Sequence, residues 1–354
     1  GSEQIKMVHS FVFDGDMDRD FIRSLGIRFE VPMREEVYNR HVAFATADGG
    51  VWAEPVQPLN GRRILTLDGD KGWQGRQMRG ERIPAYEKFD AKNRHLLDHW
   101  AVWNGFRLSQ TTADAFSIRK RTHADRPWIG TFSGTRAPGY VFAGDVSGGL
   151  GVALKDFWQS YPTALQVDNA AARNARLTVW MWSPDAEPMD LRHYDNVAHD
   201  LEASYEDVQE GMSTPYGVAR THTLTLVPSV AYGGKETVAR TAVMLAEDAP
   251  LLCTPEYLHA KHAFGVWSLP DRSNLKRARV EDRLKDYLDY YVKAVDQHRW
   301  YGFWNYGDFM HTYDSVRHTW RYDVGGYAWD NTELASNMWL WYSFLRTGRA
   351  DPWR

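Results

Sequence analysis

The stretch Leu177-Thr-Val-Trp-Met-Trp182 carries the clearest information about the fold. Successive residues of a β-strand point to opposite faces, so the aliphatic side chains at 177, 179 and 181 would share one face and the two tryptophans the other. Both faces are apolar, and both therefore need cover from other parts of the chain. A strand of this kind is typical of two sheets packed face to face.

Short segments with β character, separated by Gly, Asp, Asn and Pro, extend this pattern along most of the chain. Two of them flank Asp48-Gly49-Gly50, where glycine adopts positive φ at low cost, so we expect a β-hairpin there. There is no βαβ rhythm and no internal repeat. We therefore expect a large antiparallel β-sandwich over residues 1–272. The expected strands are Met7–Phe13, His41–Ala47, Val51–Val56, Phe116–Arg121, Tyr140–Ala143, Gly151–Leu154, Leu177–Trp182, His222–Val227 and Val238–Leu245.

At Asp271-Arg-Ser-Asn274 the pattern of the sequence changes from short β segments to helices. Two helices are expected beyond this point. The second of them is expected to begin after Asn331-Thr332, with Glu333 in its first turn and Gly348 just beyond its end. Residues 273–354 are thus expected to form a separate helical domain. The first helix of that domain is predicted from an apolar stripe at helical spacing, formed by Val280, Leu284, Leu288, Tyr291 and Val295.

Composition excludes several classes of function. Lys and Arg number 42 and Asp and Glu 46, so the net charge of -4 provides no electrostatic basis for binding nucleic acid or an anionic membrane surface. Cys253 is the only cysteine, which excludes an internal disulfide framework and a thiolate-cluster metal site; its apolar setting predicts a buried side chain. The usual nucleotide-binding, α/β-hydrolase and zincin motifs do not occur.

Between the two expected helices lies a stretch that is rich in both aromatic rings and ionisable groups, from Trp300 to Glu333. A long connection of this composition is typical of the mouth of a helical barrel, because loops carry functional groups that rigid elements position. The alternative is a structural loop whose tryptophans plug the top of a core. The polar residues of interest here are Asn305, Asp308, His311, Arg321, Asp323, Asp330 and Asn331.

Two other groupings of polar residues are of interest. His193, Asp195 and His199 resemble a metal-ligand set, but they lack a helical pattern and a fourth donor, so no metal site is predicted there. Arg220 and His222 are two residues apart at the start of an expected strand and hence on one face. Such a pair could neutralise a carboxylate. An edge salt bridge beside an ordinary surface histidine explains the pattern equally well.

Several stretches resemble the exo-rhamnogalacturonan lyase family, polysaccharide lyase family 26, and its bacterial relatives. The resemblance rests on YGFWNYGD (301–308), HTWRYDVGGYAWDN (318–331), LWYSFLRTGR (340–349), GDVSGGLGVALKDFWQSYPTAL (144–165), MWSPDAEPMDLRHYD (181–195) and LLCTPEYL (251–258). It implies a central β-sandwich followed by a C-terminal α/α toroid, and cleavage of rhamnogalacturonan I by β-elimination. The two expected helices would be only the first of such a toroid.

β-Elimination next to a uronic acid needs a cation for the carboxylate, a base for the C5 proton and an acid for the leaving oxygen. By side-chain type and setting we expect His311 as the base and Tyr322 as the proton donor. Arg321 or Arg220 is expected to hold the carboxylate. The candidate sugar contacts are Arg220, His222, Trp304, Asn305, Asp308, Asp330 and Asn331.

Two rival functions remain open. One is a glycoside hydrolase of the same α/α architecture, with Asp308 and Asp330 as its acid and base. The other is a carbohydrate-binding fragment without turnover. No cofactor is expected: Ca²⁺ is conceivable at Asp308 and Asp323, but these residues lack a calcium-loop signature. The expected partner is an acidic polysaccharide or oligosaccharide, besides the remaining parts of a longer protein.

Overall fold

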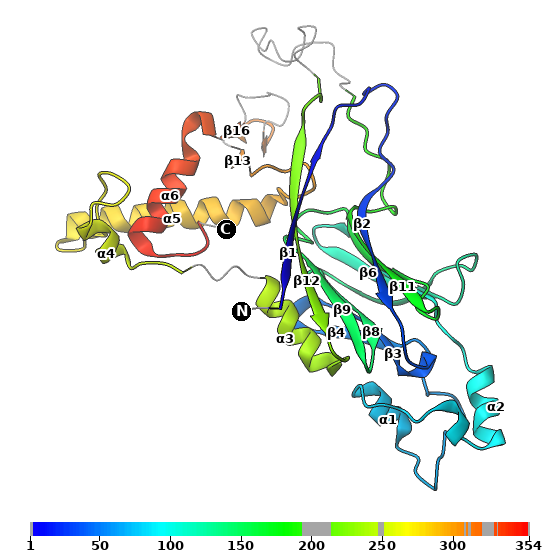
Figure 1. Ribbon diagram of the computed structural model, residues 1–354. Helices are drawn as coiled ribbons and strands as arrows, with labels where there is room; N and C mark the ends of the chain where they lie inside the picture. The colour runs from blue at the N-terminus through cyan, green and yellow to red at the C-terminus, as the bar shows by residue number, and fades with distance from the viewer. Residues whose placement is uncertain are drawn as a thin grey trace. The chain divides into compact units, whose positions relative to one another are not determined.

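The chain is divided into two compact units in a computed structural model that describes residues 3–192, 214–246, 251–307, 309–310, 313–320, 329–330 and 332–352 (Figure 1). The sandwich unit contains residues 1–191, 215–248 and 302–304, and the helical unit contains residues 192–214, 249–301 and 305–354. None of the described helices combines the length and the apolar character that crossing a membrane requires.

Two antiparallel six-stranded sheets form the sandwich unit and confirm the predicted β-sandwich (Figure 1). In the first sheet the spatial order is β1 (Ile5–Val12), β12 (Ala219–Ser229), β9 (Gly148–Leu154), β8 (Tyr140–Asp145), β3 (Arg40–Ala45) and β4 (Val51–Pro55). In the second it is β2 (Leu25–Pro32), β11 (Asn174–Trp182), β10 (Thr163–Asp168), β5 (Gly105–Thr112), β6 (Ala115–Arg121) and β7 (Ile129–Gly134).

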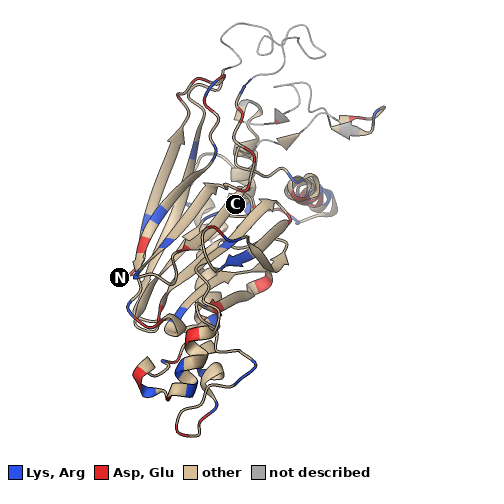
Figure 2. Cartoon of the chain, turned by 90° about the vertical axis from the view of Figure 1, so that its right-hand side faces the viewer, with Lys and Arg blue, Asp and Glu red and all other residues tan. Residues whose placement is uncertain are grey.

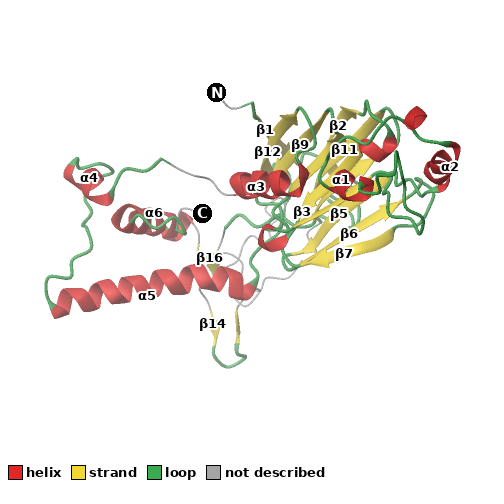
Figure 3. Cartoon of the chain, turned by 90° about the horizontal axis from the view of Figure 1, so that it is seen from below, coloured by secondary structure: helices red, strands yellow, loops and turns green. Residues whose placement is uncertain are grey.

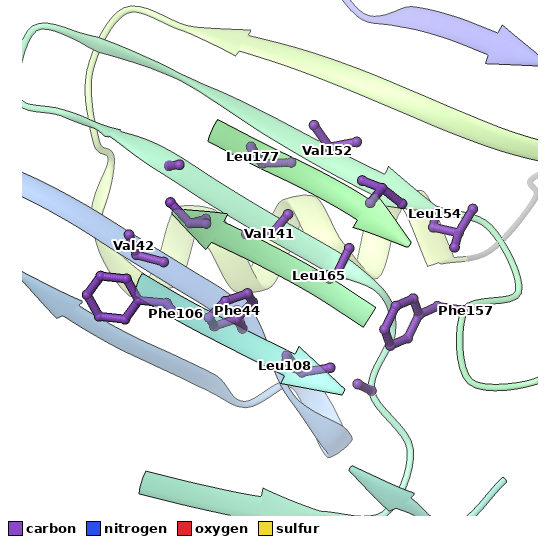
Figure 4. Packing of buried hydrophobic residues seen from close by; sticks show 14 of the residues in the cluster. Val42, Phe44, Phe106, Leu108, Val141, Val152, Leu154, Phe157, Leu165 and Leu177 are labelled. Carbon is purple, nitrogen blue, oxygen red and sulfur yellow. The ribbon is translucent and has the colours of Figure 1, made fainter. Parts of the chain in front are cut away.

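The core lies between the two sheets, where apolar side chains from both interdigitate (Figure 4). The aliphatic side chains of β11 point into it and are 0% exposed at Leu177, Val179 and Met181, as the alternation predicts. The two tryptophans of the strand are half-buried, and their indole N–H groups donate to Gln166 Oε1 and Glu187 O at 3.0 Å. Trp182 also packs against the main apolar cluster, so it has the apolar cover that the sequence suggested, while Trp180 has a polar partner.

The hairpin at Asp48-Gly49-Gly50 is confirmed. β3 pairs with β4, and a short 3₁₀ turn, η2 (Ala47–Gly49), joins them. Gly49 has φ 73° and Asp48 has φ 56°, so the turn uses the left-handed region at two successive positions. Glycine and Asp are among the residues that enter this region most easily.

The segment Val238–Leu245 is a helix and not the predicted strand. α3 (Gly234–Ala246) packs against the first sheet, and the contacts include β3, β4 and β9 (Figure 3). Val238, Ala242 and Leu245 recur at helical spacing and cover a second apolar cluster that includes Phe142 of β8. The apolar residues were thus recognised correctly, but their period was read as that of a strand.

Residues 57–104 connect β4 of the first sheet to β5 of the second and form an excursion with short helices, which the sequence analysis did not predict. It contains α1 (Trp73–Met78), a 3₁₀ turn η3 (Tyr86–Lys88) and α2 (Ala91–His99), and a further turn η1 (Val37–Asn39) precedes β3. The excursion has its own small core, which is built on the buried side chains of Tyr38, Leu59, Leu65, Trp73, Ile83, Phe89 and Leu97. Asp90 caps α2 by accepting a hydrogen bond from Asn93 N at 2.8 Å.

In the helical unit, α5 (Leu275–His298) confirms the first predicted helix. Asn274 caps it, since its Oδ1 accepts from Lys276 N at 3.1 Å and from Arg277 N at 3.0 Å. The second helix starts later than predicted. A 3₁₀ turn, η6 (Thr332–Leu334), comes first, and α6 (Ser336–Thr347) follows because Ala335 takes a left-handed conformation (φ 57°) that interrupts the helix.

The predicted end of α6 is confirmed, with Gly348 left-handed at φ 67°.

The short α4 (Pro255–Ala260) is capped by Thr254. Cys253 comes just before this cap and is exposed, so the predicted burial of its side chain is wrong. Two two-stranded ladders complete the described part of this unit, β13 (Phe309–Met310) with β16 (Trp329–Asp330) and β14 (Tyr313–Asp314) with β15 (Thr319–Trp320).

Candidate functional site

The strand pair β1–β12 brings two histidines and an arginine together on one face. In the antiparallel register His9 lies opposite His222, and Phe11 lies opposite Arg220. Burial alternates along both strands, with the neighbours Ser10 and Thr221 exposed. Arg220 and His222 therefore share the covered face, as their spacing predicts. Sequence reasoning missed His9, although the alternation through Met7, His9 and Phe11 was its signal.

His222 is enclosed and not the ordinary surface histidine of the alternative interpretation, since only 4% of the residue is exposed. Neither ring nitrogen has a hydrogen-bond partner among the residues that the structure describes. Burial, followed by the positive charges of Arg220 and His9, lowers the pKa of His222 to about 4. The imidazole is therefore neutral near pH 7, and Arg220 is the cation of the pair.

Among the described residues of the sandwich unit, a series of aromatic ring contacts begins at His222. The ring of Phe303 lies 5.2 Å from that of His222 and meets Trp182 edge-on at 5.4 Å. Trp304 contacts Phe303 at 4.6 Å and Phe11 at 6.2 Å between centroids. Trp304, a predicted sugar contact, is therefore half-buried, and it contacts Phe11, the residue opposite Arg220 in the strand pair. Rings of this kind give a flat apolar surface to which a sugar can stack.

The segment Gly302–Trp304 is held by the sandwich unit itself. Gly302 N donates to Gln159 O at 2.7 Å, and Phe303 N donates to Tyr161 O at 2.8 Å. The aromatic stretch of the sequence is therefore divided: residues 302–304 complete the β1–β12 site, whereas Trp300 and Tyr301 before them and the residues from 305 onwards belong to the helical unit. A linear sequence gives no sign of such a division.

Some described rings of the helical unit fill its core, as the structural alternative requires, whereas others, such as Tyr306 and Tyr313, are exposed. Phe309 stacks on Tyr291 of α5 at 3.8 Å and meets Trp300 edge-on at 4.8 Å. The indole N–H of Trp320 donates to His298 Nε2 at 3.0 Å. These contacts order the loop that leads away from α5.

Two candidate sugar contacts lie among the described residues of the helical unit. Asn305 Oδ1 accepts from Gly307 N at 2.9 Å, so the side chain shapes a turn. Asp330 lies opposite Phe309 in the β13–β16 ladder, and its Oδ1 is buried without a hydrogen-bond partner in the described part of the chain. Such an atom is a place where a ligand hydroxyl could bind.

The remaining candidates fall outside the described residues: His311, Arg321, Tyr322, Asp308, Asp323 and Asn331, and also His193, Asp195 and His199. Among the described residues, no three His, Cys, Asp or Glu side chains gather in a way that could hold a metal ion. The described part of the candidate site therefore consists of the cation Arg220, the neutral imidazole of His222 and aromatic rings such as that of Phe303.

Comparison with known proteins identifies both units. The model described as the PcRGLX-like protein central beta sandwich domain matches residues 1–243, and the one described as the PcRGLX-like protein C-terminal alpha/alpha toroid domain matches residues 248–354. A Bacillus subtilis (strain 168) protein described as uncharacterized protein YetA is 36% identical over 365 residues. That match covers 100% of this chain but 41% of the relative, so the chain spans about two fifths of the relative's length.

Proposed function

Because this chain belongs to the PcRGLX-like family, which is related to rhamnogalacturonan lyases, we propose that it carries part of a polysaccharide lyase that cleaves rhamnogalacturonan-type chains by β-elimination. The observation that supports this most is the order of the two family domains, which follow each other along almost the whole sequence. The Bacillus subtilis relative is described as uncharacterized, and support for the chemistry comes from the side chains of this chain.

The reaction breaks the bond between C4 and the glycosidic oxygen and removes the proton on C5. The electron pair of the C5–H bond forms the new C4=C5 double bond, and the leaving oxygen takes up a proton. The C5 proton is hard to remove because the neighbouring carboxylate is already negative. A cation that holds this carboxylate lowers the barrier by stabilising the charge that develops on it.

Arg220 is the described residue best suited to that task. A guanidinium binds a carboxylate through two parallel hydrogen bonds, which fixes the sugar as well as its charge. Arg220 lies on β12 opposite Phe11, whose ring contacts Trp304, so a cation and an apolar ring edge occur in one neighbourhood. Arg321 remains the second candidate for the same role.

His222 fits a positioning role better than direct contact with the substrate, since it is almost wholly enclosed. As a neutral ring it places no second positive charge next to Arg220, so it does not compete for the carboxylate. His311 as base and Tyr322 as proton donor complete the proposal on chemical grounds alone.

The source of oxygen in the products separates elimination from hydrolysis. Rhamnogalacturonan I is incubated with the full-length protein in water labelled with heavy oxygen, and the products are weighed by mass spectrometry. Elimination predicts products without label, one of which has lost a water relative to the hydrolysis product. Incorporation of the label would support the hydrolase alternative instead, with Asp308 and Asp330 as the paired carboxylates.

A further inference from the structure

The outer face of the second sheet carries a row of polar residues that the proposed chemistry does not use. The strand register aligns Glu30, Arg176, Asp168, Gly105 and Arg121 across β2, β11, β10, β5 and β6. The residues next to them along these strands, such as Phe29, Leu177 and Phe106, belong to the core. The row therefore points away from the core, and basic residues occur on the strands of this unit (Figure 2).

A pocket of about 190 Å³ opens over this row. Gly105 forms part of its wall, and a Cβ at that position would come within 3.0 Å of Arg121 Nε and 3.4 Å of Asp168 Oδ1. The absence of a side chain there lets these two groups lie over the sheet. The residues that line this pocket, called the arginine pocket below, are Arg28, Asn104, Gly105, Arg121, His123, Ala124, Asp168, Asn169 and Arg176.

The arginine pocket has an excess of positive charge. Three guanidinium groups face one carboxylate, Asp168, whose Oδ1 accepts from Arg121 Nη2 at 3.0 Å and whose Oδ2 accepts from the Gln166 amide. His123 is paired with Asp125, which is not part of the lining. The hydrogen bonds already satisfy Asp168, so the pocket favours an anionic ligand over a cation.

Arg121 is held rigidly at the pocket wall. Its side chain is 17% exposed, its Nη1 donates to Ala124 O at 2.8 Å, and its guanidinium lies 4.2 Å from the ring centroid of Trp128. Its Nε is buried and has no hydrogen-bond partner among the described residues. A buried, unpaired N–H on a fixed cation is costly unless a ligand or a water accepts from it.

The side chains of the two other arginines, Arg28 and Arg176, are more exposed than that of Arg121. Arg176 is 48% exposed in its side chain and lies 3.6 Å from Glu30. Arg28 donates through Nε to Thr178 Oγ1 at 3.3 Å and is otherwise exposed. Glu30 is 60% exposed, so solvent screens its pairing with Arg176 and leaves that guanidinium available to a better acceptor.

We propose that the arginine pocket is a non-catalytic binding site for a carboxylate-bearing sugar unit of an acidic glycan. The ligand class rests on the proposed function, while the anionic character rests on the pocket alone. A carboxylate matches the planar fork of a guanidinium, and the amide side chains in the lining suit the hydroxyl groups of one sugar ring. The site would hold the polymer away from the reacting bond.

Binding is measured by calorimetry on the 354-residue chain with a short galacturonic acid oligosaccharide, the matching neutral galactose oligosaccharide, and inorganic sulfate. We expect the acidic sugar to bind and the neutral one not to bind. The double variant Arg28→Gln/Arg176→Gln should weaken binding of the acidic sugar by about tenfold or more, because charge-assisted hydrogen bonds are lost. Both side chains are exposed enough that the fold should be unaffected.

The matched control is Arg62→Gln/Arg63→Gln, which changes the net charge equally at exposed positions outside the pocket. It should leave binding unchanged. The proposal is overturned if the pocket variant and the control bind alike, if the neutral sugar binds as well as the acidic one, or if sulfate binds as tightly as the acidic sugar. Binding requires no turnover, so a failure here is distinct from the absence of lyase activity, and intact binding without product would reject only the proposed function.

Discussion

His9 and His222 lie directly opposite each other on β1 and β12, with ring centroids 6.2 Å apart and an angle of 36° between the ring planes. His222 is enclosed, and Arg220 lies two residues before it on the same face. A second or third positive charge in such a place is unfavourable, so protonation of His222 and the folded state oppose each other.

Stability is expected to fall as the pH is lowered from about 6.5 towards 4. The pKa of His222 is lowered to about 4 and that of His41, by burial, to about 3, both from 6.5. Between the lowered pKa of each histidine in the folded chain and the ordinary value of 6.5 in the unfolded chain, the unfolded chain binds more protons than the folded one. The free energy of unfolding therefore rises with pH over this range. Each histidine contributes a slope of up to about 1.4 kcal/mol per pH unit. Urea denaturation across this range measures the slope.

The variant His222→Phe should reduce this slope by the share of His222 and leave that of His41, because a phenyl ring can occupy the same aromatic surroundings and does not titrate. The control His123→Gln, at a side chain that is 67% exposed, should leave the slope unchanged. An unaltered slope in His222→Phe would show that the imidazole is not held neutral by the fold.

The core between the sheets should be sensitive to cavities. Phe106 is 0% exposed and lies in the main cluster with residues of both sheets (Figure 4). Replacing it by alanine is expected to cost about 3–5 kcal/mol of unfolding free energy, from lost burial and the cavity left behind. Chemical denaturation measures the cost. Phe132→Ala, at a residue 47% exposed, is the control and should cost much less; equal costs would argue against the sandwich core.

Asp145 should act as an essential acceptor at the turn between β8 and β9. Its carboxylate accepts from Arg34 N at 2.7 Å, Glu35 N at 3.2 Å, and Ser147 N and Oγ at 2.8 and 2.9 Å. Burial raises the pKa of Asp145, but these donors lower it more, to below its ordinary value. Asp145→Asn keeps the shape and presents an NH₂ group to N–H donors, so we expect a loss of about 1–3 kcal/mol.

The cost of Asp145→Asn should shrink as the pH falls, because protonation of the native carboxyl removes the same acceptor. Thermal or urea unfolding at neutral and acidic pH tests both statements. Asp18→Asn, at an exposed residue, should be neutral at either pH. A destabilisation of Asp145→Asn that persisted at strongly acidic pH would contradict the assigned role of the charge.

The sequence predicted the sandwich because short β segments, such as that of β11, are separated by turn residues, and it predicted α5 from one apolar stripe at helical spacing. It failed at α3, where an apolar run fits either period and only the sheet beneath decides. The sequence analysis also missed β2 and β10. Their outward positions carry Arg28 and Gln166, whose hydrogen-bond partners Thr178 and Trp180 lie on the neighbouring strand β11.

For the candidate site, spacing alone placed Arg220 and His222 on one face. Their surroundings depend on contacts between residues far apart in sequence, which periodicity cannot report. His9 is brought in by strand pairing and Phe303 by hydrogen bonds from its segment to Gln159 and Tyr161. The burial of His222, and hence its neutral state, follows from these long-range contacts.

Arg220 should matter for rate more than for binding if it holds the carboxylate during elimination. Arg220→Gln is expected to lower kcat by about 10²–10³, as for the loss of one charge-stabilising group in other active sites, with a smaller effect on KM. Steady-state kinetics of the full-length protein measure both constants, and Arg321→Gln is the comparison. If only Arg321→Gln loses activity, the carboxylate is held by Arg321.

The most direct test of the central claim follows ultraviolet absorbance while the full-length protein acts on rhamnogalacturonan I. A C4=C5 double bond conjugated to the carboxyl group absorbs, and the intact polymer does not. Our account predicts a steady rise in absorbance that the variant His311→Ala abolishes. Cleavage of the polymer into shorter chains without any rise in absorbance would contradict it.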